Sequence, residues 1–243
     1  MKTKNLLTIT ALLSCLFVQS QTIYTEYPKG QYPYIGGQKE FYKDFHDILM
    51  EQKLLPCENK KEFYTINLVV YPDKSINYIK PEDIDIVKAN KCTFELTKEV
   101  LKYMDKWKPA IIDSKEVAAI TSITVIPNDL FDRYTYGYTI DSAIKEAEYE
   151  GGIQAFRNKM VENIDIFDFK SNGKTPIELL IKFTIEKDGK LSNVRIENSS
   201  GSKEFDKRIL DGIKGIKKKW SPKTLHGEPI ESEFNLPIKI EID

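Results

Sequence analysis

The stretch that decides the fold is residues 177–196, IELLIKFTIEKDGKLSNVRI. From Ile177 to Ile185 apolar residues alternate with polar ones, which is the pattern of a strand with one buried face. Lys187-Asp188-Gly189-Lys190 then supplies a turn, because Gly189 tolerates a positive φ. Leu191–Ile196 returns as a second strand. The stretch therefore predicts a β-hairpin.

A similar pattern occurs 115 positions earlier, and this offset aligns Gly36 with Gly151. The matched positions are Gly36-Gly37 with Gly151-Gly152, Phe41 with Phe156, Ile66 with Ile181, Leu68 with Phe183, Val70 with Ile185, and Asp73 with Asp188. After a deletion of two residues the offset becomes 113, which pairs Lys106-Trp107 with Lys219-Trp220, Pro109 with Pro222, and Val117 with Ile230. Because the chain's 2 tryptophans share one register, the sequence predicts an internal duplication.

Each copy shows the same order of elements. A double glycine lets the backbone turn into a first helix, whose apolar residues are spaced by three and four positions. These are Phe41, Phe45, Ile48 and Leu49 in the first copy, and Phe156, Met160 and Ile164 in the second. A hairpin follows, formed in the first copy by Tyr64–Val70 and Ile76–Ile79 around Pro72-Asp73-Lys74.

A second helix and a last strand complete each copy. The helices carry Leu96, Val100 and Tyr103, or Ile209, Ile213 and Ile216, and end before Pro109 or Pro222, since proline does not continue a helix. The last strands are Ile120–Ile126 and Phe234–Ile242. We predict an α+β fold of two tandem units, each a three-stranded antiparallel sheet with two helices on one face.

The order of the elements gives domain boundaries. We expect a signal peptide at residues 1–20, a first, divergent unit at 21–130, a linker at 131–148 and a second unit at 149–243. The expected linker carries many tyrosines and charges.

The first twenty residues have the order of a secretory signal. Lys2 and Lys4 precede an apolar run from Leu6 to Val18, and Ser20 puts a small residue before the expected cleavage site. The run is shorter than the roughly 20 residues that span a bilayer, so an uncleaved anchor is disfavoured. Lipidation at Cys15 is the lesser alternative. The sequence predicts export to the periplasm and no membrane span after cleavage.

Cysteine usage agrees with export. Besides Cys15 the chain has only Cys57 and Cys92, which are candidates for a disulfide in an oxidising compartment. Two unpaired buried thiols remain the alternative. Neither cysteine has a histidine or second cysteine nearby in sequence, so we expect no metal site.

The second copy resembles the C-terminal domain of TonB, a periplasmic energy-transducing protein. The residues that carry the resemblance are Ile181–Ile185, Asp188-Gly189-Lys190, Ser192–Ile196, Phe205-Asp206, Lys219-Trp220-Ser221-Pro222 and Leu236-Pro237-Ile238, with Glu148–Gly152 and Phe156 as the lead-in. The resemblance covers Tyr149–Asp243 well and the region from Ile35 to Ile126 more weakly. It implies a domain that binds an extended peptide from an outer-membrane receptor along its last strand.

The physics of such binding is available in the last strand, because an open sheet edge offers unpaired N–H and C=O groups. The candidate peptide-binding residues are Phe234, Asn235, Leu236, Ile238, Lys239 and Ile240. Pro237 has no N–H, so it fits an edge strand and also removes one bond that a docked peptide could make.

Other conspicuous residues favour structural roles. Trp107 and Trp220 at repeated helix ends fit core positions better than ligand platforms, and the Lys217-Lys218-Lys219 run fits a solvated helix end. His46 and His226 have no nucleophile beside them, and Glu148 with Glu150 has no reason to be desolvated.

We expect no catalytic residues, no cofactor and no metal, and the formal net charge of -1 gives no reason to expect nucleic acid. The leading hypothesis is a periplasmic binding or adaptor protein with a protein or peptide partner, linked through the resemblance to TonB-dependent transmembrane transport. The alternative is an envelope scaffold or peptidoglycan-associated structural protein. An enzyme of unrecognised type is a third, weaker hypothesis.

Overall fold

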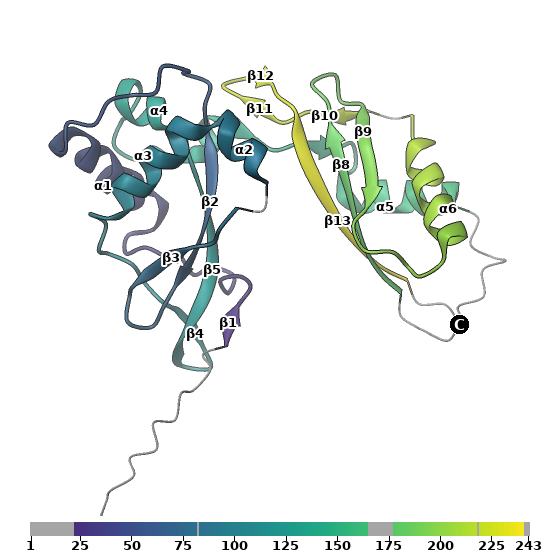
Figure 1. Ribbon diagram of the computed structural model, residues 1–243, viewed down its shortest axis with the longest axis horizontal. Helices are drawn as coiled ribbons and strands as arrows, with labels where there is room; N and C mark the ends of the chain where they lie inside the picture. Colours follow the sequence, from purple (N-terminus) through teal and green to yellow (C-terminus); the bar gives the residue numbers. More distant parts are fainter. Residues whose placement is uncertain (1–21, 82, 165–176, 218, 241–243) are drawn as a thin grey trace, which may run out of the picture. The chain divides into compact units, whose positions relative to one another are not determined.

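The computed structural model describes residues 22–81, 83–164, 177–217 and 219–240, and the chain divides into two compact units (Figure 1). Unit 1 comprises Met1–Leu55 and Phe63–Val125, and unit 2 comprises Pro56–Glu62 and Ile126–Asp243. The expected signal peptide with Cys15, and the last residues of the expected final strand, lie outside the described residues.

Unit 1 is one sheet with helices packed against it. Its elements are β1 (Ile23–Tyr24), α1 (Gly37–Glu51), β2 (Tyr64–Val70), β3 (Ile76–Tyr78), α2 (Ile84–Ala89), α3 (Lys91–Leu101), β4 (Ala110–Ile112) and β5 (Lys115–Val125). The strand order is β1-β5-β2-β3, and β4 also pairs with β5. The sheet thus has five strands where the sequence predicted three, because β1 adds to β5 in parallel and β4 forms a short hairpin with it.

The predicted helix stripe of unit 1 is confirmed as its core. Phe41, Phe45, Ile48 and Leu49 of α1 are all buried. The inward residues of β2 are buried as well, with Ile66 and Leu68 at most 1% exposed. The alternation seen in the sequence therefore places one face of β2 against the helices.

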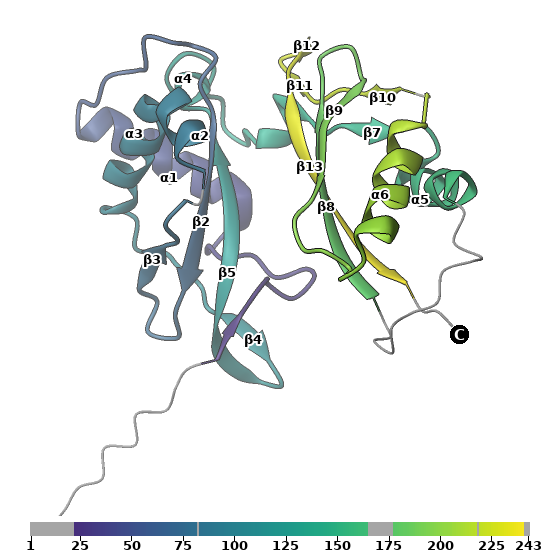
Figure 2. The ribbon, with the colours of Figure 1, turned by 45° about the vertical axis from the view of Figure 1, so that its right-hand side comes forward.

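Unit 2 contains a smaller main sheet and two minor sheets of short strands. Its elements are α4 (Pro127–Asp132), the 3-10 helix η1 (Ile140–Ser142), β6 (Ile144–Lys145), β7 (Glu148–Tyr149), α5 (Gly152–Asn163), β8 (Ile177–Ile185), β9 (Leu191–Ile196), α6 (Lys203–Lys214), β10 (Trp220–Ser221), β11 (Thr224–Leu225), β12 (Glu228–Pro229) and β13 (Ser232–Ile240). The main sheet has the order β13-β8-β9, with all pairs antiparallel. Figure 2 shows α5 and α6 on one side of it.

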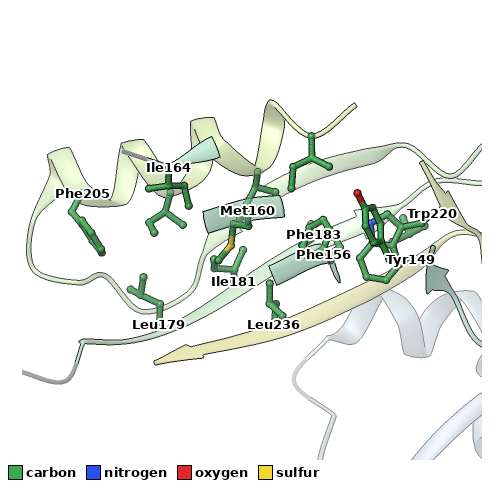
Figure 3. Close-up of a cluster of buried hydrophobic side chains, with 14 of the residues drawn as sticks. Tyr149, Phe156, Met160, Ile164, Leu179, Ile181, Phe183, Phe205, Trp220 and Leu236 are labelled. Carbon is green, nitrogen blue, oxygen red and sulfur yellow. The ribbon is translucent and has the colours of Figure 1, made fainter. Parts of the chain in front are cut away.

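The core of unit 2 lies between that face and the two helices (Figure 3). Alternate residues of β8 are buried while the intervening ones are not, as the period-two pattern predicted. Met160 from α5 lies over Ile181, Phe156 lies beside Phe183 with ring centroids 5.7 Å apart, and Phe205 from α6 lies toward the other end of the cluster, near Leu179. Burial of these apolar side chains is the main source of stability in a unit of this size.

The segment expected to be a linker is an ordered part of unit 2. Residues 131–148 contain η1, β6 and the first residue of β7, and Tyr138, Ala143 and Ile144 among them are buried. Strand β6 pairs with β11, so the segment forms part of the small sheet β12-β11-β6. The sequence did not indicate these elements, because strands of two residues are too short to show a periodic pattern of apolar residues.

Both tryptophans lie in the core, as the sequence predicted. Trp107 is 2% exposed and Trp220 is 4% exposed. Tyr34 pairs with Trp107 in an isolated bridge, and Tyr149 pairs with Trp220 in the same antiparallel way. The tyrosine and tryptophan ring centroids are 5.3 Å apart in unit 1 and 5.5 Å apart in unit 2. Each tryptophan also meets the first aromatic residue of its unit's first helix, Phe41 or Phe156.

Candidate binding edge on strand β13

Strand β13 forms an edge of the main sheet of unit 2. Its nine residues pair antiparallel with β8, from Ser232 opposite Ile185 to Ile240 opposite Ile177. Within the described part of the chain β13 has no other strand partner, and β9 forms the opposite edge. An edge strand presents a row of backbone N–H and C=O groups that no neighbouring strand pairs.

The position of Pro237 shows which backbone groups face outward. Its partner Leu180 uses both backbone groups on the β9 side, because its N–H donates to Asn198 Oδ1 at 2.6 Å and its C=O accepts from Glu197 N at 2.8 Å. Pro237 and Leu180 are therefore a non-hydrogen-bonded pair, and the backbone of Pro237 faces the open side. The missing N–H of Pro237 costs the sheet nothing and leaves a gap in the open edge.

Alternation along the strand assigns the remaining positions. Glu233, Asn235 and Lys239 have the same parity as Pro237, so their N–H and C=O groups face the open side. Phe234, Leu236 and Ile238 bond to β8 instead. Ile240 has their parity and pairs with Ile177. The structure thus divides the six candidate residues: four have the parity that bonds to β8, and Asn235 and Lys239 have the parity of the open side.

The core-facing candidates have a different role. Leu236 is fully buried, and Phe234 stacks on Phe183 with ring centroids 5.3 Å apart. Ile238 packs partly buried against the same cluster. These side chains pack β13 against the core cluster, while Glu233, Asn235 and Lys239 are exposed.

A side chain from α5 reaches the open edge at Pro237. Arg157 Nη2 donates to the Pro237 carbonyl oxygen at 3.4 Å, a long hydrogen bond. Sequence reasoning missed Arg157, because nothing in its helix position marks it as a neighbour of a strand 80 residues later. The contact occupies one of the outward carbonyls of β13.

The corresponding edge in unit 1 is covered at both ends. At one end β1 pairs in parallel with β5, placing Ile23 opposite Ala118. At the other end Tyr42 Oη, from α1, donates to the Thr124 carbonyl at 2.6 Å. Tyr42 is 1% exposed, so this second cover is tight and shielded from water. Fewer backbone groups remain open on β5 than on β13.

The outer face of the unit 2 sheet is polar. Arg195 on β9 reaches across β8 to Glu233 on β13, with Nη2 and Oε2 2.7 Å apart. Lys182 on β8 forms an ion pair with Glu197, with Nζ and Oε2 3.5 Å apart. Exposed pairs of this kind contribute at most about 1 kcal/mol each. Leu180 and Pro237, which lie opposite each other, are the apolar residues among these charges, and neither is buried.

His226 has a partner that the sequence did not indicate. Its Nε2 lies 2.9 Å from Oδ1 of Asp129, a nearly buried carboxylate that also accepts from the Tyr138 hydroxyl at 3.1 Å. His226 occupies the turn between β11 and β12 with φ 52. The pair fastens that turn to α4, and no serine or cysteine among the described residues bonds to the imidazole.

Cys57 and Cys92 are both in the disulfide-bonded form. A disulfide sulfur is not a thiolate, so these two residues are not available as metal ligands. Within the described ranges, no helix combines the length and apolar character that crossing a membrane requires.

A comparison with known proteins agrees with this geometry. Residues 178–241 match the model of the family described as Gram-negative bacterial TonB protein C-terminal. The match runs from β8 through β13 and confirms the resemblance for this part of unit 2. That family is a periplasmic type of domain, not enzymatic, and mediates protein interactions. No curated protein and no solved structure matches the chain.

Proposed function

We propose that this chain is a periplasmic adaptor that binds an extended peptide segment of a partner protein along the open edge of β13. The observation that carries the proposal is the edge position of β13 within a segment that matches the TonB C-terminal family. A docked strand would find outward backbone groups at Glu233 and Asn235. A handful of such bonds, at about 0.5–1.5 kcal/mol net each, gives micromolar binding when side chains add to them.

We also propose that the two units are tandem copies with different duties. Their shared tyrosine–tryptophan pairing and first-helix aromatic residue support a duplication. In unit 1 the corresponding edge is partly occupied by β1 and Tyr42, so the peptide is expected to bind unit 2. The partner proposed is the N-terminal segment of an outer-membrane receptor, which links the chain to TonB-dependent transport.

The test is a titration of the protein from Gln21 onward with N-terminal plug peptides of receptors encoded beside its gene. Asn235→Pro removes an outward N–H while leaving the β8 ladder intact, and should weaken binding several-fold. Ser122→Pro makes the corresponding change on the edge of β5 and serves as the matched control. Pro237→Ala restores an outward N–H and should tighten binding.

The outcomes separate the parts of the proposal. No binding at high micromolar peptide argues against receptor coupling. Equal losses for Asn235→Pro and Ser122→Pro argue against unit 2 as the binding unit.

A scaffolding role is the second candidate, because an open edge also fits the same strand of a second copy. In that case β13 would pair with β13 across a two-fold axis. Solution mass at increasing concentration measures this directly, and Asn235→Pro should then shift a dimer toward monomer. A pull-down with purified sacculus tests the peptidoglycan-associated form of the same role.

We propose that the bridge predicted from the sequence joins Cys57 to Cys92. Closing a loop of this length stabilises a fold by about 3–4 kcal/mol on the chain-entropy model. The exported protein should show no thiol reactive to an alkylating reagent when unfolded without reductant, and a peptide map should contain one cross-linked pair. Changing both cysteines to alanine should lower the free energy of unfolding by that amount.

A further inference from the structure

The turn between the hairpin strands has the same geometry in both units. In unit 2 the Gly189 N–H donates to Glu186 O, and Glu186 N–H donates to Lys190 O, both at 2.8 Å. In unit 1 the Lys74 N–H donates to Tyr71 O at 2.9 Å, and Tyr71 N–H donates to Ser75 O at 2.9 Å. Lys74 and Gly189 both have positive φ, 66 and 79.

What differs is how closely the turn approaches the tryptophan. In unit 2 the Trp220 N–H donates to Gly189 O at 2.9 Å. A Cβ placed on Gly189 would lie 2.0 Å from the Trp220 carbonyl oxygen, so only glycine permits this contact. Unit 1 has Lys74 at that position, and in its described residues no such bond joins the turn to Trp107.

A pocket of about 460 Å³ lies in unit 1 between Lys74 and Trp107. This volume is within the range of small-molecule sites. Its walls come from the loop before α1 and from the residues that follow the tryptophan. They include Tyr32, Ile35, Trp107 and Pro109 among the apolar residues, and Lys74, Lys108 and Glu116 at charged positions.

The charges indicate what the pocket can hold. Neither Lys74 nor Lys108 forms an ion pair with any described residue, and Glu116 is their single acidic counterpart in the wall. The Tyr32 side chain is 59% exposed and Ile35 is 53% exposed, so apolar surface is available beside the two cations. An anion with an apolar ring would satisfy both features, because the ring covers the apolar wall while the anion meets the lysines.

We infer that this pocket is a binding site for a small organic anion that carries an apolar ring. The site belongs to unit 1 and is independent of the peptide edge of unit 2, so either one can fail without the other. A free carboxylate on a ring-bearing compound is the simplest ligand of this class. The aromatic C-terminal residue of a peptide has the same chemistry and is a second possible source.

Calorimetric titration with 3-phenylpropionate and with its uncharged amide tests the inference. The carboxylate should bind at one site per chain and about tenfold more tightly than the amide, the ratio expected from one net charge interaction of about 1.4 kcal/mol. The Trp107 emission should change on binding. The tripeptide Gly-Gly-Phe, with a free or amidated C-terminus, forms the second arm of the experiment. If the free-acid tripeptide binds more tightly than 3-phenylpropionate, the ligand is a peptide C-terminus; the reverse order indicates a small compound.

The variants assign the site. Lys74→Gln with Lys108→Gln should abolish the preference for the carboxylate, whereas Lys29→Gln with Lys39→Gln, two exposed lysines outside the pocket, should keep it. Tyr32→Ala should weaken both the acid and the amide. Equal binding of acid and amide, no saturable binding, or a preference that survives the Lys74 and Lys108 changes would each overturn the inference.

Discussion

The two units use the same aromatic anchor but leave different surfaces available. Each packs a tyrosine, a tryptophan and a helix phenylalanine together. Unit 1 covers much of its sheet edge and opens a pocket beside its tryptophan, while unit 2 closes the corresponding space and leaves its edge open. The two units therefore differ in the surface that surrounds a similar aromatic cluster.

The largest expected effect tests whether the anchor is equivalent in the two units. Trp107→Ala and Trp220→Ala should each lower the free energy of unfolding of their own unit by about 3–5 kcal/mol, since each removes a large buried side chain. Every variant retains one indole, so its fluorescence reports the other unit during denaturant unfolding while circular dichroism reports both. A loss below about 1 kcal/mol for either variant would contradict the equivalence.

A smaller effect tests the difference at the hairpin turn. Gly189→Ala should destabilise unit 2 by about 2–5 kcal/mol, because the backbone at position 189 has a positive φ and the added Cβ would collide with the Trp220 backbone. Lys74→Ala, at the corresponding turn of unit 1, should change stability by no more than about 0.5 kcal/mol. Urea unfolding of both variants measures the contrast, which disappears if the turn of unit 2 can move away from the tryptophan at little cost.

The side-chain hydrogen bonds that cover the two sheet edges should contribute differently to the free energy of unfolding. Tyr42→Phe leaves the Thr124 carbonyl without its buried donor and should cost about 1–3 kcal/mol. Arg157→Ala removes only a long contact and should cost less than about 1 kcal/mol. Thermal unfolding gives both values. Equal costs would mean that the edge of unit 2 is held as firmly as that of unit 1.

The smallest expected effect is the dependence of stability on acid that Asp44 of unit 1 should cause. Burial by itself raises the pKa of Asp44, but the Lys106 ammonium and the Tyr34 hydroxyl outweigh it and hold that pKa below its usual value. A carboxyl with a lowered pKa in the folded state stabilises above its unfolded pKa, and this stability is lost as the pH falls through the folded pKa. In unit 2 the position 115 residues later is Lys159.

Asp44→Asn should therefore reduce stability at neutral pH and flatten its decline toward low pH. Unfolding by urea at a series of pH values between about 2 and 7 measures the slope, since Asp titrates near pH 3.9 when unperturbed. Asp47→Asn, which removes an exposed carboxyl on the same helix, is the control. An unchanged slope in Asp44→Asn would show that the pair with Lys106 is not formed in solution.

Much of the fold follows from local pattern. The predicted strands Tyr64–Val70, Ile177–Ile185 and Leu191–Ile196 agree with β2, β8 and β9. The signals were strong because one face of each hairpin is buried and the alternation is therefore sharp. The sequence did not predict α2, α4 or β1, since elements of two to six residues are too short to show such a periodicity.

The candidate site was only partly predictable. The sequence indicated the last strand and the significance of Pro237, but it could not separate residues that bond to β8 from those that face outward. That division depends on the register with β8 and on the bonds that Leu180 makes with the β9 side. Arg157 and Tyr42 were missed because the strands that they cover lie 80 and 82 residues away.

The sequence by itself determined the alternation, the helix stripes and the tryptophan anchors, because each is a local arrangement of apolar side chains. Only the tertiary structure decided which edge and which pocket stay open. A backbone group stays open only when no distant segment pairs with it. The pairing of β1 with β5 and the hydrogen bond between Gly189 and Trp220 are two such long-range contacts, and each closes part of a surface. Local pattern predicts what a segment becomes, and long-range contacts decide what it leaves available to a partner.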